Sequence, residues 1–166
     1  YTWLSSAKQD PPGPGPGAPC HIPIFAGIPQ VIRITEGPLK ADIATALSGT
    51  LTIGVAGCTM ARSAVETLRA LRVERVTLAW DMDASKNPSV ARSLRTAVAI
   101  YREEGFGIAL ETWDGVVHKG IDDALCARLS VTVHTGEAVD RVVKDICEAA
   151  GADVARVKPS ASGAPA

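Results

Sequence analysis

Long apolar runs are absent from this 166-residue sequence. No segment reaches the roughly 18 consecutive apolar residues that a membrane span requires, and no signal peptide is visible. The four cysteines form no C-x-x-C pair and have no histidine cluster beside them apart from the lone Cys20-His21, which argues against a zinc site and against a disulfide framework. We therefore expect a soluble, cytoplasmic protein with no membrane partner.

An excess of either charge is also missing. The formal net charge is −1, so the chain as a whole does not attract nucleic acid, and a contact with one would need a local basic patch. A content of 46% hydrophobic and 21% charged residues is typical of one globular domain.

Proline and glycine are concentrated near the N-terminus. Residues 11–17 read Pro-Pro-Gly-Pro-Gly-Pro-Gly, a tract that can form neither a helix nor a sheet ladder. We expect residues 1–29 to be a linker and edge segment, residues 30–158 to form the domain, and residues 159–166 to be a disordered tail. Because the sequence begins with Tyr1 rather than Met, we also expect it to be part of a longer protein with further domains.

Strand-like and helix-like segments alternate between these ends. Such alternation demands crossover connections, and it predicts an α/β fold with three layers, in which a mainly parallel sheet of four or more strands has helices on both faces. The expected strands are residues 31–35, 50–55, 74–80 and 106–112, with possible short strands at 130–134 and 153–157; the expected helices are 38–47, 59–72, 88–104, 122–128 and 137–150.

Two carboxylates end the apolar segment at residues 76–80. In extended backbone, residues i and i+2 point the same way, so Asp81 and Asp83 are expected to converge, with Met82 on the other side. Convergent carboxylates repel unless a positive charge lies between them, and Mg²⁺ or Mn²⁺ suits oxygen ligands of this kind. Alternatively the two residues are structural, because Asp is favoured at strand ends, turns and helix N-caps.

A second strand also ends in a carboxylate, at Glu36, and Gly37 then permits a tight turn into a helix. Glu36 could serve as a general base, a general acid or a metal ligand, or simply as an acid near the positive end of a helix. Lys40 follows in the first helical turn, where it could face an incoming phosphate or be a solvated surface lysine.

Lysine and acid recur after the fourth expected strand, at Lys119 and Asp122. If this segment reaches the edge of the sheet where Asp81 lies, Lys119 would counter a phosphate and Asp122 would orient a metal-bound water. The alternative is that Asp122 caps a short helix. Farther from these segments, Arg92 and Arg95 share one side of an expected helix and could contact a nucleic-acid backbone, although such stripes are more often solvated.

Taken together, these motifs resemble the Toprim domain that bacterial primases, topoisomerases and some nucleases share. More narrowly, they are similar to Toprim-like domains of unknown function in plasmid, phage and mobile-element proteins, which often lie beside primase or helicase modules. The resemblance extends over about residues 31–125 and is carried by residues 36–42 (Glu-Gly-Pro-Leu-Lys-Ala-Asp), 81–84 (Asp-Met-Asp-Ala), 87–88, 113–114 and 119–123 (Lys-Gly-Ile-Asp-Asp).

The resemblance implies Mg²⁺-dependent nucleotidyl transfer or strand cleavage on DNA or RNA, with nucleotides and helicase or primase modules as partners. Glu36 would be the general base or acid, and Asp81 and Asp83 would hold the metal, as would Asp122 in a site that Lys119 completes. Ser85 stands where some Toprim enzymes have another acid, so the sequence leaves open whether one or two metal ions bind.

Two other functions remain open. Residues 81–85 also look like the nucleophile loop of haloacid dehalogenase-type phosphatases, with Lys119, Asp122 and Asp123 as later motif residues. In those enzymes the aspartate pair follows the first strand rather than the third, and the spacing from Lys119 to Asp122 is too short. The remaining possibility is a binding module for nucleic acid or a protein partner that does not catalyse a reaction.

Overall fold

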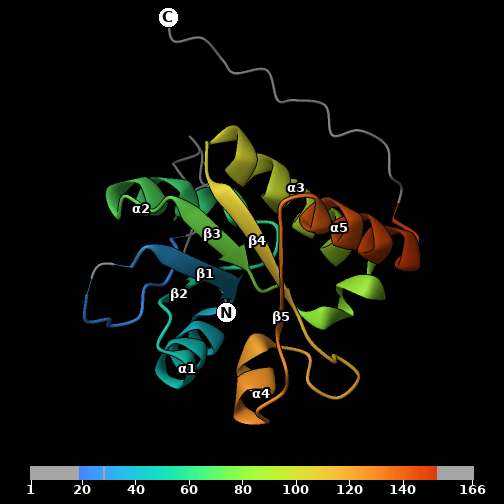
Figure 1. Cartoon of the computed structure of the whole chain (residues 1–166), viewed down its shortest axis with the longest axis horizontal. Helices are drawn as coiled ribbons and strands as arrows, with labels where there is room; N and C mark the ends of the chain where they lie inside the picture. The colour runs from blue at the N-terminus through green and yellow to red at the C-terminus, as the bar shows by residue number, and fades with distance from the viewer. Residues whose placement is uncertain (1–18, 28, 153–166) are drawn as a thin grey trace, which may run out of the picture.

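A five-stranded sheet forms the centre of the computed structural model, which describes residues 19–27 and 29–152 (Figure 1). The strand order is β2-β1-β3-β4-β5; the first four strands are parallel to their neighbours, and β5 runs antiparallel to β4. The strands are β1 (Val31–Glu36), β2 (Thr52–Val55), β3 (Arg75–Leu78), β4 (Gly107–Thr112) and β5 (Thr132–Thr135).

Helices cover both faces of this sheet, as Figure 1 shows. On one side lie α1 (Pro38–Ser48) and α4 (Ile121–Cys126), and on the other lie α2 (Val65–Ala70), α3 (Pro88–Glu103) and α5 (Glu137–Ala149). Two short 3₁₀ turns, η2 (Ala61–Ala64) and η3 (Met82–Ser85), precede α2 and α3. The three-layer α/β fold predicted from the sequence is therefore confirmed.

Each face of the sheet has its own apolar cluster because strand side chains alternate between the faces. The larger cluster lies against α2, α3 and α5 and includes the fully buried Ile34, Leu78, Trp80 and Tyr101. The smaller one lies under α1 and α4 and is built from Ala44, Ala79, Trp113, Ile121 and Ala124.

The ends of several elements follow from local chemistry. Pro38 opens α1 at a position where the missing N–H costs no helical bond, and Gly49 ends the helix in the left-handed conformation, with φ 67°. Asn87 caps α3, its side chain accepting a hydrogen bond from the Ser89 N–H at 3.0 Å. These boundaries agree with the sequence-based expectations.

Some expected boundaries are wrong. The strand expected at residues 74–80 leaves the sheet after Leu78, because the chain turns into η3. The helix expected at 59–72 begins as the 3₁₀ turn η2 and becomes α-helical only at Val65. The short strand expected at 130–134 is β5, whereas the one expected at 153–157 lies outside the described residues, as do the tract at 11–17 and the tail at 159–166.

The backbone of the expected edge segment pairs with the sheet at His21. His21 forms an isolated antiparallel bridge to Gly54 of the edge strand β2, with N–H···O distances of 2.7 and 2.9 Å. In the described part of the chain, no helix is long and apolar enough to cross a membrane.

Parallel pairing brings the carboxyl ends of β1, β3 and β4 to one side of the sheet, which we call the carboxyl edge. Ile34 of β1 is in register with Leu78 of β3, and Leu78 is in register with Leu110 of β4. The segments that follow these strands contain Lys40, Asp81 and Lys119. Ligands commonly bind at such an edge in open α/β sheets.

Candidate functional site

Asp81 lies at the centre of the carboxyl edge, three residues beyond the end of β3. Its side chain is only 5% exposed, and both carboxylate oxygens accept hydrogen bonds from Lys40 Nζ, at 2.6 and 2.7 Å. Lys119 Nζ lies 3.2 Å from Asp81 Oδ2. A carboxylate this deeply buried needs such compensation, because leaving water costs several kcal/mol for an unpaired ion.

Asp83 also lies beside Lys119, but its backbone conformation differs from the expected one. It lies in the 3₁₀ turn η3 rather than in a strand, so the extended i, i+2 geometry predicted for Asp81 and Asp83 is wrong. The turn is closed by the Ala84 N–H donating to the Asp81 carbonyl at 3.0 Å. The two carboxylates nevertheless converge, because Lys119 Nζ is 2.9 Å from Asp83 Oδ2 as well as near Asp81.

The loop between β4 and α4 holds Lys119 in position. The Met82 N–H donates to the Lys119 carbonyl at 3.0 Å, and Trp113 Nε1 donates to the His118 carbonyl at 2.9 Å. Gly115 lets the loop approach η3, because a Cβ there would lie 2.1 Å from Met82 Cβ. The hydrogen bond to Asp83 is the main cause that raises the pKa of the Lys119 ammonium, so this lysine remains charged.

We call Lys40, Asp81, Asp83 and Lys119 the Asp–Lys cluster. Asp122 adjoins it in the first turn of α4, whose N-cap is Gly120. No described side chain caps this helix, so the alternative in which Asp122 is the cap is wrong. A Cβ on Gly120 would lie 2.3 Å from Asp122 Oδ1 and 3.3 Å from Lys40 Cε, so the end of Lys40 and the Asp122 carboxylate border the same glycine.

Glu36 is the last residue of β1 and is half-buried. Alternation along β1 places it on the face of Ile34, towards α2 and α3, whereas Asp81 bonds to Lys40 on the face of α1. Within the described residues its carboxylate makes no hydrogen bond or ion pair. Glu36 is thus at the carboxyl edge but outside the Asp–Lys cluster.

The arginines named as possible nucleic-acid contacts lie on the other side of the sheet from Lys40. Arg92 on α3 is exposed and Arg95 is half-buried, and the structure does not bring either into the Asp–Lys cluster. Farther along α3, Arg102 pairs with Asp140 of α5 at 2.6 Å.

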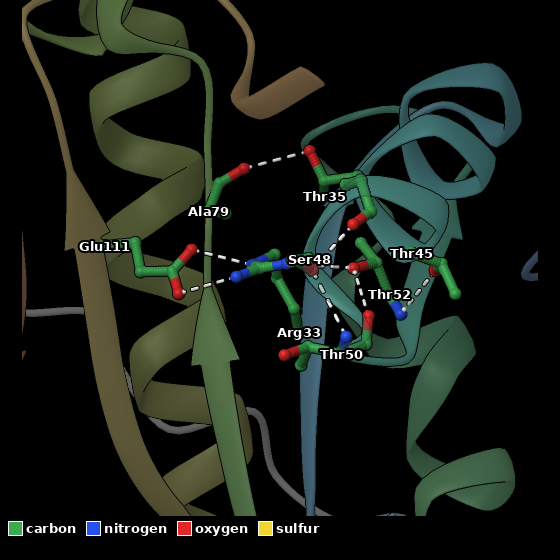
Figure 2. A network of polar contacts seen from close by, with 9 residues as sticks. Arg33, Thr35, Thr45, Ser48, Thr50, Thr52, Ala79 and Glu111 are labelled. Carbon is green, nitrogen blue, oxygen red and sulfur yellow. Dashed lines mark hydrogen bonds and ion pairs between the residues drawn. The ribbon is translucent and has the colours of Figure 1, made fainter. Parts of the chain in front are cut away.

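A buried ion pair that the sequence reasoning missed lies beneath α1. Arg33 of β1 reaches across β3 to Glu111 of β4, with N···O distances of 2.7 and 3.0 Å, and both side chains are 8% exposed. Figure 2 shows the guanidinium between Glu111 and Ser48, whose Oγ is 2.8 Å from Nη1 and thereby ties the end of α1 to the sheet. The available signal was a charged residue beside apolar ones inside each strand: Arg33 stands between Ile32 and Ile34, and Glu111 follows Leu110.

The functional groups at the carboxyl edge are carboxylate oxygens and lysine ammonium groups. Asp83 Oδ1 and Asp122 Oδ1 are buried atoms that have no hydrogen-bond partner in the described part of the chain. Across residues 19–27 and 29–152, however, no three His, Cys, Asp or Glu side chains form a group that could hold a metal by themselves. A divalent cation would therefore rest on one or two carboxylates and retain several waters, as Mg²⁺ commonly does.

Comparison with known proteins assigns the chain to one family. Neither a curated protein nor a solved structure gives a significant match to the chain. The family model described as "Domain of unknown function (DUF3854)" matches residues 25–130, a range that includes Glu36, the Asp–Lys cluster and Asp122. Because this match covers more than half of the sequence, the chain belongs to the DUF3854 family.

Proposed function

We propose that the carboxyl edge is a Toprim-like site that binds the phosphate groups of a nucleic acid or nucleotide and carries out Mg²⁺-dependent phosphoryl or nucleotidyl transfer. One observation carries this proposal: two lysines and two aspartates from three separate chain segments converge just beyond the ends of adjacent parallel strands. Acidic groups suit a divalent cation, and lysines suit the phosphate that such a cation would accompany.

The donor set is compatible with Mg²⁺. Asp81 and Asp83 would hold the cation. The Oδ1 atoms of Asp83 and Asp122, which have no hydrogen-bond partner among residues 19–27 and 29–152, are oxygen acceptors of the type that the cation or its waters require. When bound, Mg²⁺ would neutralise negative charge on the reacting phosphate. Because Lys40 and Lys119 already compensate Asp81, they would have to yield part of their contact to the cation.

The lysines supply the phosphate contacts in this proposal. Lys119 has a side chain 55% exposed and stays charged, so it can donate to a phosphate oxygen without leaving the carboxyl edge. Lys40 is less accessible, at 28% exposure. Glu36, whose carboxylate has no hydrogen bond or ion pair with any described residue, would accept a proton from an attacking hydroxyl or water.

A binding module without catalysis is the second candidate, and the position of Glu36 favours it. The carboxylate that would act as general base lies outside the Asp–Lys cluster, while the cluster itself is already neutralised by lysines. By contrast, a phosphatase that uses Asp81 as nucleophile is disfavoured, because Lys40 covers both oxygens of a side chain that is 5% exposed.

Calorimetric titration of Mg²⁺ and Mn²⁺ tests the metal site. We expect saturable binding to the wild-type chain and none to the double variant Asp81→Asn, Asp83→Asn. Asp140→Asn on α5 is the matched control, because it removes an exposed aspartate far from the cluster in the sequence. Circular dichroism verifies that each variant is folded. Binding that persists in the double variant would refute the assignment of Asp81 and Asp83.

Primer-synthesis and nuclease assays on single-stranded DNA and RNA then separate the two candidates. The catalytic proposal requires turnover that Glu36→Gln abolishes while nucleic-acid binding survives. If the wild-type protein binds nucleic acid in a cluster-dependent way but turns over no substrate in either assay, the binding module is the correct function.

A further inference from the structure

We propose that Lys40 is an exchangeable counter-ion: it occupies Asp81 in the metal-free protein and leaves it for the phosphate when a divalent cation binds. This inference rests on the proposed function, since it describes how the same site takes up metal and phosphate. It predicts that Lys40 lowers the affinity of the site for metal alone and couples metal binding to phosphate binding.

The first support is the way in which Lys40 holds Asp81. Its ammonium contacts both carboxylate oxygens, at 2.6 and 2.7 Å. The negative charge of this buried side chain is therefore already compensated by a positive charge. A cation bound to Asp81 would lie within a few ångströms of that ammonium, where like charges repel strongly in a poorly solvated site. Metal and Lys40 therefore compete for the same carboxylate.

The second support is that the Lys40 side chain has a second acceptor nearby. Its Cε borders Gly120, next to the buried Asp122 Oδ1, which has no hydrogen-bond partner among the described residues. Because Gly120 has no side chain, the Asp122 carboxylate and the end of Lys40 can both approach it closely; a Cβ there would lie 2.3 Å from Asp122 Oδ1 and 3.3 Å from Lys40 Cε. Lys40 can thus turn from Asp81 towards Asp122 and the solvent, where a phosphate would arrive.

The third support is that this movement needs only the side chain. The far end of α1 is fixed to the sheet by Arg33 Nη1, which donates to Ser48 Oγ at 2.8 Å. Near the start of the helix, Gly54 of β2 packs so closely that a Cβ on it would lie 2.6 Å from the Gly37 carbonyl oxygen. With both ends of α1 held, the flexible lysine side chain is the part that exchanges.

The test compares Lys40→Met with Lys144→Met, titrating each full chain with Mg²⁺ alone. Lys144 makes an exposed i, i+4 pair with Glu148 on α5 and is the matched control for the loss of one lysine. We expect Lys40→Met to bind Mg²⁺ roughly tenfold more tightly than wild type, which corresponds to about 1.4 kcal/mol, and Lys144→Met to bind as wild type does. Lys40→Arg, which keeps the positive charge, should keep the weak affinity.

Thermal unfolding gives a second readout. Lys40→Met leaves Asp81 without its main partner, so the melting temperature should fall in metal-free buffer and recover on addition of Mg²⁺ by more than wild type gains. A purely structural lysine would show the fall without the recovery.

The outcomes separate this inference from the proposed function. If wild type binds Mg²⁺ through Asp81 and Lys40→Met binds it no more tightly, the exchange is refuted and the metal site stands. If neither protein binds Mg²⁺, both proposals fail. Binding by Lys40→Met alone would support the exchange in its strongest form, in which the lysine blocks the site until phosphate arrives.

Discussion

At the scale of single residues, Tyr101 is the clearest case in which burial alters chemistry. Its side chain is fully buried on α3, and its hydroxyl donates to the Ala61 carbonyl at 2.7 Å. Burial is the main cause that raises the pKa of the Tyr101 phenol, and nearby Cys20 adds to the effect. The folded state therefore holds this proton more tightly than the unfolded chain does.

We predict that stability falls steeply in alkaline solution because of Tyr101. The stability that Tyr101 contributes is fully present below the ordinary tyrosine pKa of 10.0. It is lost as the pH rises from there through the raised pKa of the folded state, because in this range the unfolded chain ionises more readily than the folded one. Urea unfolding at a series of pH values, with tyrosinate absorbance as a second signal, measures this slope.

Tyr101→Phe provides the control for that prediction. It removes the hydrogen bond to Ala61, at a cost of roughly 1 kcal/mol near neutral pH, but also removes the ionisable group. Its stability should depend less on pH above 10 than that of wild type. Equal alkaline slopes for the two proteins would contradict the prediction.

At the scale of elements, the Arg33–Glu111 pair ties β1 to β4 across β3. We predict that Glu111→Gln costs about 3–5 kcal/mol of unfolding free energy, because it leaves the Arg33 guanidinium buried without a counter-charge. The double variant Arg33→Met, Glu111→Leu should cost less than Glu111→Gln alone, since an apolar pair of similar size needs no charge compensation. Chemical denaturation measures both.

An exposed pair serves as the comparison for this element-scale prediction. Arg102 and Asp140 join α3 to α5 with side chains 41% and 61% exposed, so Asp140→Asn should cost less than about 1 kcal/mol. If Glu111→Gln lowered the unfolding free energy no more than Asp140→Asn does, the buried pair would not stabilise the contact between β1 and β4 as its geometry indicates.

At the scale of the whole molecule, the fold extends beyond the residues that the family model matches. The match ends at residue 130, yet α5 places Val139, Val143 and Cys147 in the larger apolar cluster, and β5 pairs with β4. Each buried apolar side chain contributes roughly 1.5–3 kcal/mol, so the three together approach the total stability of about 5–15 kcal/mol that a domain has.

We therefore predict that a chain truncated after residue 130 does not unfold cooperatively. It should bind a dye for exposed apolar surface and should lack a sharp thermal transition, whereas the full chain should show one. Thermal unfolding of both proteins, followed by circular dichroism under the same conditions, compares the two transitions. A cooperative transition in the truncated chain would show that α5 is an accessory rather than part of the core.

The sequence by itself determined the α/β class, most helix boundaries and the presence of carboxylates at the end of one strand and shortly after another. These features depend on local patterns: apolar periodicity, Pro38 and Gly49 at the ends of one helix, and Asn87 at the start of another. Such signals act over a few residues, so a single sequence contains them directly.

Only the tertiary structure decided which charges meet. Lys40 and Asp81 are 41 residues apart and Arg33 and Glu111 are 78 apart, and their contacts depend on strand order and register, which local periodicity does not encode. From the repulsion between Asp81 and Asp83 the sequence reasoning expected a divalent cation between them, and in the folded chain the Lys119 ammonium contacts both carboxylates. The fold also decided that Glu36 lies on the opposite face of the sheet from that cluster. Alternate residues of β1 share a face, and Ile34, two residues before Glu36, packs into the larger apolar cluster.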